Sequence, residues 1–328
     1  MQKVLITGAS GFIGGFLTED MICRGLETYA AVRPSSNTAD LVKAGVRILY
    51  WNFEDIDEMA SLLREYHFDY IIHNAGLTKS KSKAEFFKVN TEYVKNLTDA
   101  IRLSGIQIKK ILFVSSLASY GPADFQENGM VSESSIPHPV TIYGESKLEA
   151  EKLLMATELP YIIIRPTAVF GPRDKDFLTL FKMVNDGFEV MAGLKPQMLS
   201  FIYVKDLVRF TGDALTSDLC RKAYFMCDGQ MYKAEYFNEI VRKLLNKKTI
   251  KIKLPLPIVW LVAHVSGFIA NFTGKYPPLN PEKFNEIKAR NWSCDLTPAI
   301  RDLNFKPQYN LKSGLEETIS WYKNEHWL

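Results

Sequence analysis

The sequence contains few cysteines, and their spacing does not group them. Only four occur in 328 residues, at Cys23, Cys220, Cys227 and Cys294, and there is no Cys-x-x-Cys motif. A disulfide framework or a zinc site would need cysteines at short, recurring spacings. We therefore expect free thiols, no metal site and a reducing compartment, the cytoplasm.

An excess of charge of one sign is also lacking. The chain has 40 Lys and Arg residues against 37 Asp and Glu residues, which leaves a net charge of +3. Proteins that bind nucleic acid concentrate basic residues in one region or on one face. The near-balance here predicts no nucleic-acid partner.

No apolar run is long enough for an ordinary membrane span. Such a span needs about 20 apolar residues, whereas the most apolar stretch, residues 257–272, is shorter and carries His264, Ser266 and Asn271. We expect this stretch to form a buried packing helix, a lid over a substrate or a helix lying on a membrane surface. The N-terminal residues lead directly into a strand pattern, without the segments of a signal peptide.

The first half of the chain alternates short apolar runs with amphipathic stretches, which predicts a parallel sheet flanked by helices. Near-continuous hydrophobicity is typical of strands that are covered on both faces. The pattern predicts a doubly wound α/β domain over residues 1–169 and a smaller substrate-binding α/β domain over 170–328, with a segment at about 199–228 returning to the main sheet. The predicted strands of the main sheet are 4–7, 29–32, 46–50, 70–73, 111–115 and 161–165, and the predicted helices are 14–24, 56–66, 91–104 and 146–157.

A glycine-rich turn follows the first predicted strand. Residues 4–14 read VLITGASGFIG, with Gly8, Gly11 and Gly14 at intervals of three and a helix beginning directly afterwards. Small residues allow a tight turn, a close approach of backbone N–H groups to a pyrophosphate, and close packing of helix on strand. The context of strand, turn and helix predicts a dinucleotide site of the Rossmann type. Its other predicted contacts are Ser10, Phe12 and Ile13.

The end of the second strand bears on which dinucleotide is bound. An acidic residue about 20 residues past the turn commonly holds the ribose 2′-hydroxyl of NAD. The sequence TYAAVRPSSN instead has Arg33 there, with Ser36 close behind. Because a guanidinium can hold a 2′-phosphate by forked hydrogen bonds, NADP(H) is favoured. NAD(H) stays open, since an arginine at this place can also be a solvated surface residue.

Two more strand ends provide predicted cofactor contacts. Asn52 and Phe53 follow the third strand, where an amide side chain can meet the adenine. Asn74, Ala75 and Gly76 follow the fourth strand, where small residues let the chain run beside the cofactor.

The catalytic candidates are a serine, a tyrosine and a lysine. Tyr143 and Lys147 lie four residues apart in IYGESKLEAEKLL, so a helix would place them on one face. An ammonium there can lower the pKa of a phenol, which can then exchange the proton that accompanies hydride transfer. The fifth strand ends at Ser115 and Ser116, and the carboxyl ends of such strands face the ligand crevice.

The order and spacing of these elements resemble the extended short-chain dehydrogenase/reductase family of the NAD-dependent epimerase/dehydratase type. Residues 165–174 (RPTAVFGPRD) and 201–208 (FIYVKDLV) resemble its second-half landmarks, so that the resemblance covers nearly the whole chain. It implies that Ser116, with Ser115 as the alternative, orients the substrate oxygen, that Tyr143 is the acid/base and that Lys147 holds the nicotinamide ribose. It further implies a supporting role for Asn90, a homodimer formed through the helices 91–104 and 146–157, and cofactor contacts at Pro166, Thr167 and Val169.

Departures from the family pattern bear on which of the family's reactions this chain catalyses. Dehydratases of the family carry an acidic pair after the strand-end serine, and this chain has Leu117 and Ala118. Nucleotide-sugar epimerases usually have an asparagine where Ala168 stands, and a basic residue where Leu199 and Ser200 stand.

The sequence therefore looks most like the branch of 3β-hydroxysteroid dehydrogenases and dihydroflavonol reductases. This resemblance implies an enzyme that interconverts a carbonyl and a secondary alcohol on a small apolar substrate. Two alternatives stay open: a nucleotide-sugar epimerase with tightly bound NAD, in which Arg173, Lys175 or Lys195 replaces the missing anchors, and a non-catalytic cofactor-binding regulatory protein.

Overall fold

The central sheet of the protein has seven parallel strands. The structure, a computed structural model, describes residues 1–80, 82–125, 129–273, 277 and 279–328. The strand order is β11-β6-β5-β4-β1-β2-β3, and each pair of neighbours is parallel. The strands are β1 (Lys3–Thr7), β2 (Glu27–Val32), β3 (Arg47–Tyr50), β4 (Tyr70–His73), β5 (Lys110–Val114), β6 (Tyr161–Pro166) and β11 (Lys222–Met226).

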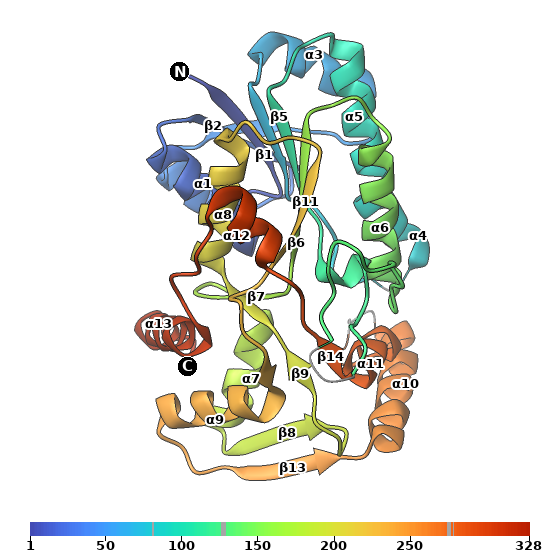
Figure 1. Cartoon of the computed structure of the whole chain (residues 1–328), viewed down its shortest axis with the longest axis vertical. Helices are drawn as coiled ribbons and strands as arrows, with labels where there is room; N and C mark the ends of the chain where they lie inside the picture. The colour runs from blue at the N-terminus through green and yellow to red at the C-terminus, as the bar shows by residue number, and fades with distance from the viewer. Residues whose placement is uncertain (81, 126–128, 274–276, 278) are drawn as a thin grey trace.

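Helices cover both faces of this sheet (Figure 1). Successive side chains of a strand point to opposite faces, so that Leu5 and Ile6 of β1 enter two different hydrophobic cores. One core is closed by α1 (Phe12–Cys23), α8 (Val204–Thr216) and α12 (Thr297–Leu303). The other is closed by α3 (Ile56–Tyr66), α5 (Tyr93–Ser104) and α6 (Ile142–Met155).

The predicted doubly wound Rossmann fold is confirmed, with one strand more than the six that were predicted for the main sheet. The seventh strand is β11, which lies in the segment that we expected to return to the sheet. Helix α6 begins at Ile142, ahead of the predicted residue 146, because the Thr141 side chain caps it by accepting a hydrogen bond from the Gly144 N–H at 3.0 Å. The division of the chain at residue 169 stays a prediction.

The second half of the chain adds three small sheets. Strand β7 (Ala168–Phe170) pairs with β10 (Phe201–Tyr203), and β8 (Phe188–Ala192) pairs with β13 (Ile250–Leu254). Strand β9 (Met198–Leu199) lies between β12 (Tyr232–Lys233) and β14 (Asn291–Trp292). Between β9 and β10 the chain passes from one of these sheets to another at the buried Ser200, whose hydroxyl donates to the Gln230 carbonyl at 2.8 Å.

An aromatic core joins the helices of this half. Phe181 of α7 (Asp176–Asn185) stacks on Phe237 of α9 (Ala234–Leu245) and also contacts Tyr322 of α13 (Leu311–Asn324). Phe170 and Phe201 extend the same cluster to β7 and β10, which connect it to the main sheet. The remaining helices are α2 (Ala39–Lys43), α4 (Lys83–Phe87), α10 (Leu256–Thr273) and α11 (Pro281–Lys288).

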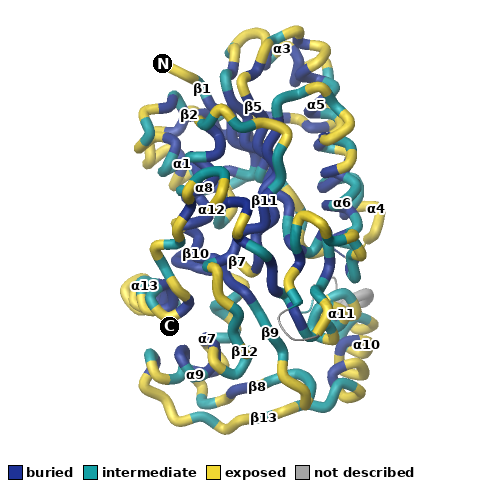
Figure 2. Tube along the Cα trace, viewed as in Figure 1, coloured by how far each residue is buried: buried dark blue, intermediate teal, exposed yellow. Residues whose placement is uncertain are grey.

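The apolar stretch 257–272 falls within the single helix α10, at the end of the molecule opposite α3 (Figure 1). The side chains of Asn271 and Phe272 lie outside the described residues. Figure 2 shows exposed positions along α10 and along the neighbouring β13. No helix among the residues that the structure describes is long and apolar enough to cross a membrane.

Candidate active site

The glycine-rich turn lies against the chain that follows β4. Gly8 has a φ of +67°, and a Cβ there would lie 2.7 Å from the Ala75 backbone nitrogen. A Cβ at Gly14 would lie 2.1 Å from the Gly8 carbonyl oxygen. Any side chain at these two positions would collide with backbone, so the turn requires glycine at both.

The turn leaves the start of α1 open to a ligand. Gly11 is the N-cap of α1 and has no side chain to accept the first helical N–H groups. Those N–H groups and the helix dipole favour a negatively charged group. Around them, Ser10 is exposed, while Phe12 and Ile13 are half-buried. The predicted pyrophosphate site therefore has the local geometry that its role needs.

The predicted adenosine contacts follow β2 and β3. Arg33 is exposed directly after β2, and its carbonyl accepts a hydrogen bond from the Ser36 N–H at 2.9 Å. The Asn52 side chain accepts from the Glu54 N–H at 3.0 Å, and the buried Phe53 ring stacks on Tyr93 at 4.8 Å. All four predicted residues thus lie at the carboxyl edge of the sheet, where β1 also ends in the glycine turn.

Three side chains join β1 to the segment after β4. The Thr7 hydroxyl accepts from the Ala75 N–H at 3.1 Å and shares a 3.0 Å hydrogen bond with His73 Nδ1. The Asn74 amide donates to the Gly8 carbonyl at 3.3 Å. Burial, with the nearby Lys147 ammonium adding to it, lowers the pKa of His73 to about 3. His73 is therefore neutral at physiological pH and acts as a fixed part of the floor of the site.

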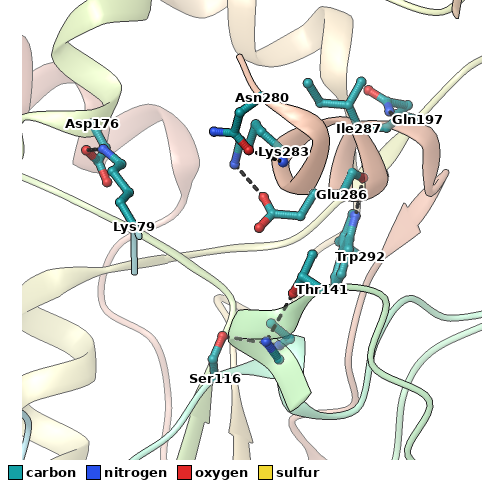
Figure 3. Close-up of polar contacts among 12 residues, drawn as sticks. Lys79, Ser116, Thr141, Asp176, Gln197, Asn280, Lys283, Glu286, Ile287 and Trp292 are labelled. Carbon is teal, nitrogen blue, oxygen red and sulfur yellow. Dashed lines mark hydrogen bonds and ion pairs between the residues drawn. The ribbon is translucent and has the colours of Figure 1, made fainter. Parts of the chain in front are cut away.

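The side chains of Tyr143 and Ser116 lie next to each other near the start of α6. Burial raises the pKa of Tyr143 to about 12, and the nearby Ser116 side chain, which favours the ionised phenol, offsets this only in part. Ser116 caps a 3₁₀ turn, and its hydroxyl accepts from the Ala118 N–H at 3.1 Å. Figure 3 shows Ser116 and Thr141 on neighbouring segments below α11. At neutral pH, Tyr143 is a neutral phenol that can donate a proton.

Lys147 lies one helical turn from Tyr143. Its Nζ donates to the Val114 carbonyl at 2.9 Å and lies 4.8 Å from the centre of the Phe113 ring. Burial lowers the pKa of Lys147 to about 8, and the carboxylate of Glu151 opposes this shift. A Cβ at Gly76 would lie 3.0 Å from Nζ, so the predicted cofactor segment passes directly beside the ammonium.

The sequence also predicted that Lys147 would lower the pKa of Tyr143, and the structure shows the opposite sign. The phenol is buried, and desolvation disfavours its ionised form. Lys147 meanwhile donates to the end of β5 at Val114. Its position suits a hydrogen bond to a ligand beside Gly76 more than direct activation of the phenol.

Asn90 ties the cofactor side of the site to the catalytic helix. It lies in a π-helical turn (Lys88–Glu92), a local irregularity that is frequent at functional sites. Its Oδ1 accepts from the Leu77 N–H at 2.7 Å, and its Nδ2 donates to the Leu77 carbonyl at 3.0 Å and to the Ser146 hydroxyl at 2.9 Å. The supporting role implied for Asn90 thus has a definite geometry.

A buried carboxylate that the sequence analysis missed organises the end of β5. Glu151 accepts hydrogen bonds from the Ser115 and Ser119 hydroxyls and from Arg165, whose Nε and Nη2 lie 3.0 and 2.7 Å from it. Ser115 therefore serves this network, while its neighbour Ser116 meets the phenol of Tyr143. The sequence signal was present, because Glu151 continues the four-residue spacing of the catalytic pair.

Helix α11 covers the start of the catalytic helix. The Glu282 carboxylate accepts from the Ile142 N–H at 2.7 Å, and Glu286 lies close enough to oppose ionisation of Tyr143. Figure 3 shows Glu286 among the α11 side chains above Thr141 and Ser116. Sequence reasoning could not find these carboxylates, because they lie far from Tyr143 in the chain and carry no motif.

The remaining predicted contacts lie where β6 passes into β7. Pro166 ends β6, and the Thr167 N–H and hydroxyl both donate to the Met226 carbonyl, at 3.0 and 3.1 Å. Val169 is half-buried in β7, and Ala168 beside it is exposed. Thr167 thus links the end of β6 to β11 by two hydrogen bonds, which is a structural role in addition to its predicted contact with the cofactor.

Comparison with known proteins identifies the group to which this fold and this site belong. The NAD dependent epimerase/dehydratase family matches residues 4–223, about two thirds of the chain. The chain therefore belongs to this family, whose members are NAD(P)-dependent enzymes, epimerases and dehydrogenases among them.

Relatives of this chain differ in the reactions that they catalyse. The chain is 26% identical to the N-acetyl-alpha-D-glucosaminyl-diphospho-ditrans,octacis-undecaprenol 4-epimerase of Escherichia coli O157:H7, over 98% of this chain and 95% of that one. It is 24% identical to the decarboxylating sterol-4-alpha-carboxylate 3-dehydrogenase of Dictyostelium discoideum, over 97% of this chain and the whole of the other. The fold is that of the UDP-glucuronic acid 4-epimerase of Bacillus cereus solved with NAD, with a TM-score of 0.78 at 21% identity over 99% of this chain and all of that one.

Proposed function

We propose that this member of the family is an NADP(H)-dependent oxidoreductase that interconverts a carbonyl group and a secondary alcohol on a small apolar substrate. The observation that carries the proposal is that the Ser116 side chain lies beside the buried Tyr143 phenol, with Lys147 one helical turn from Tyr143. The pair lies at the edge of the sheet where the glycine turn opens α1. Members of the family with dehydrogenase activity, the Dictyostelium relative among them, make this the favoured reaction class.

The residues present fit a dinucleotide along this edge. The uncapped N–H groups after Gly11 would hold the pyrophosphate, and Lys147 has donors left, beyond its bond to Val114, for the ribose hydroxyls. Gly8 and Gly76 keep the path free of side chains. The bound cofactor would supply or accept the hydride.

The protein would provide the proton and the orientation. Ser116 would hold the substrate oxygen against the Tyr143 hydroxyl. Because the pKa of Tyr143 is about 12, its phenol is protonated at neutral pH and suited to donate to the oxygen of a carbonyl that is being reduced.

Cofactor choice rests on Arg33. It is exposed at the end of β2, and among the described residues it has no ion-pair partner, so its guanidinium is available to a 2′-phosphate. In a fluorescence titration, NADPH should bind at least about tenfold more tightly than NADH, about 1.4 kcal/mol. Arg33→Asp should erase this preference, and Arg64→Asp, at an exposed position of α3, should keep it. Equal binding of NADH by the wild type would refute the assignment.

The surroundings of Tyr143 favour an apolar substrate over a nucleotide diphosphate. Ala168 gives no amide at the place where epimerases carry asparagine, and the Ser200 hydroxyl is committed to the Gln230 carbonyl. Glu282 and Glu286 of α11 would repel a diphosphate near the phenol. Neutral ketones avoid this repulsion.

Turnover assays can test the reaction. NADPH oxidation would be followed with a panel of apolar ketones, including 3-ketosteroids, on the wild type and on Tyr143→Phe. We expect turnover with at least one ketone and its loss in the variant, with cofactor binding retained. If cofactor binding is intact but neither a ketone nor a UDP-sugar is turned over, the protein is better described as a non-catalytic cofactor-binding regulator.

Epimerisation of a nucleotide sugar is the second candidate. It is favoured by the Escherichia coli relative, an epimerase by name, and by the exposed Lys175 and Lys195, which could bind phosphate. Arg173, the third possible anchor, already pairs with Glu19 of α1 at 2.7 Å. This reading predicts that NAD co-purifies with the protein and that UDP-sugars are epimerised without net change in cofactor absorbance.

We also propose a homodimer formed through α5 and α6. Leu103 of α5 and Met155 of α6 are large apolar side chains that the single chain leaves exposed. Light scattering should give twice the chain mass for the wild type and a shift toward monomer for Leu103→Asp.

A further inference from the structure

Helix α10 presents apolar side chains to the outside of the molecule. Ile258, Leu261, Val262, Val265 and Ile269 are each between 46% and 56% exposed. Their spacing of three and four residues places them in one stripe along the helix. Large apolar surfaces of this kind mark interaction sites on proteins.

A different face of α10 packs on the protein. Val259 and Ala263 are buried, and the Ser266 hydroxyl donates to the Leu279 carbonyl at the start of α11. A groove of about 600 Å³ runs between α10 and α11. The exposed stripe is therefore not the side by which α10 is attached, and α11, which meets the start of α6, separates it from Tyr143.

A second apolar surface continues from the start of α10. In the paired strands β8 and β13, Phe188 lies opposite Ile250, and both are exposed together with Val190. The alternate residue Glu189 is buried against Arg242 of α9, at 3.1 Å, so the apolar side chains point away from the molecule. Figure 1 shows β8, β13 and α10 at the same end of the molecule.

Basic residues accompany these apolar surfaces. Residues 246–273 contain four lysines and no acidic residue. Lys247 and Lys248 are exposed, and neither forms an ion pair with a residue that the structure describes. Lys251 is exposed as well, but it lies opposite Glu189, on the other face of the strand pair from Phe188 and Ile250. This end of the molecule combines positive charge with exposed aliphatic side chains.

We propose that this end of the protein docks on the surface of an anionic lipid bilayer, with the exposed stripe of α10 entering the headgroup region and Lys247 and Lys248 contacting lipid phosphates. Helices that lie in a membrane interface combine an apolar face with nearby basic residues in this way. α10 has no charged side chain, and at 18 residues it is about 27 Å long and able to lie along the surface over its full length.

Charge favours a lipid surface over a second copy of the chain as the occupant. A symmetric contact between two copies would bring the same patch of each chain together, and with it Lys247 and Lys248 of both. No acidic residue within 246–273 could compensate them. Anionic headgroups provide the missing negative charge. The proposal does not depend on the reaction, because binding to vesicles is measured without cofactor or substrate.

The test is co-sedimentation of the full chain with vesicles of phosphatidylcholine, with and without phosphatidylglycerol. The wild type should pellet with the anionic vesicles, and less so at high salt. Leu261→Gln/Val265→Gln/Ile269→Gln should lower the partition coefficient by at least about tenfold, since it removes the apolar surface that enters the bilayer. The matched control Ile22→Gln/Val42→Gln/Ile300→Gln changes three exposed aliphatic side chains of α1, α2 and α12 and should bind like the wild type.

Two further measurements complete the test. Lys247→Gln/Lys248→Gln should weaken binding to anionic vesicles and make the remainder less sensitive to salt. Thermal unfolding, followed by circular dichroism, checks that each variant is folded. The proposal is overturned if the wild type stays in the supernatant, or if the folded α10 variant pellets as well as the wild type. It is also overturned if the α10 variant loses only self-association in light scattering, since a second copy would then occupy the stripe.

Discussion

Removing the charge of Glu151 should destabilise the protein strongly. In the folded chain this carboxylate is about 1% exposed and the Arg165 side chain about 4%. Arg165 also lies over the rings of Tyr120 and Phe225, at 4.3 and 5.1 Å from their centres, so it has no route to water. Glu151→Gln keeps the shape but leaves the guanidinium buried without its counter-charge.

The magnitude follows from what the substitution breaks. Loss of one partner of a buried ion pair costs about 3–5 kcal/mol, because the remaining charge stays buried and uncompensated. In addition, the new amide brings a donor into a position where the hydroxyls of Ser115 and Ser119 or the guanidinium also donate. We therefore expect a loss of at least about 3 kcal/mol in the free energy of unfolding.

Urea denaturation, followed by tryptophan fluorescence, would measure this loss in a double-mutant cycle of Glu151→Gln and Arg165→Met. The double variant should lose clearly less than the sum of the two single variants, by about 2 kcal/mol or more. Glu149→Gln on the same helix is the control, since it breaks the exposed pair with Lys152 and should cost less than about 1 kcal/mol. A cost for Glu151→Gln no greater than that of the control, or additive single losses, would refute the reasoning.

Three further outcomes are expected. Gly14→Ala should destabilise the fold by about 1–3 kcal/mol and weaken NADPH binding, because its Cβ would collide with the Gly8 carbonyl, whereas Gly15→Ala should be tolerated in thermal unfolding and fluorescence titration. Because burial lowers the pKa of Lys147 from 10.5 to about 8, the unfolded chain binds more protons between these pH values, so stability should rise from pH 8 toward 10.5. In urea unfolding at a series of pH values, Lys147→Met should lack that rise and be more stable than the wild type at pH 7, while losing cofactor affinity. Asn90→Ala should cost about 1–3 kcal/mol in thermal unfolding, because both backbone groups of Leu77 lose their partner.

The buried Lys147 would make the wild type less stable than Lys147→Met, and this loss of stability would accompany cofactor binding. A buried ammonium is unfavourable in the folded protein, and within the described part of the chain its Nζ donates to the Val114 carbonyl alone. A more stable Lys147→Met variant without cofactor affinity would show that the lysine is kept for a ligand. An unchanged pH profile would show instead that water or a shift of the helix relieves the burial.

Much of the fold could be predicted because its determinants are local. Each strand is a short apolar run, and each run is separated from the next by an amphipathic helix. Such strand–helix–strand connections are right-handed, so they predict parallel strands with helices on both faces of the sheet. The glycines at 8 and 14 are required by contacts within one turn and its neighbouring strand, which makes them readable as a motif. The four-residue spacing of Tyr143 and Lys147 is likewise a property of a single helix.

Other features depend on segments that are distant in the sequence. The sequence leaves open whether Ser115 or Ser116 faces the phenol. The structure decides this, because the Ser115 hydroxyl donates a hydrogen bond to Glu151 instead. The pKa of Tyr143 was predicted with the wrong sign, since a sequence shows the nearby lysine but does not show how deeply the ring is buried. Neither Glu282 nor Glu286 could be assigned to the site from the sequence, because both lie far from Tyr143 along the chain.

The same distinction applies to the apolar stretch 257–272. Its composition predicts an apolar helix, but composition is the same for a packing helix, a lid and a surface helix. Only the packing of α10 on α11 shows which face is exposed, because burial is set by what lies beside a helix in space. Chemistry carried by one turn or one helix could thus be read from the sequence. The surroundings of each charged or apolar group, which set its pKa and its exposure, came from contacts between distant parts of the chain.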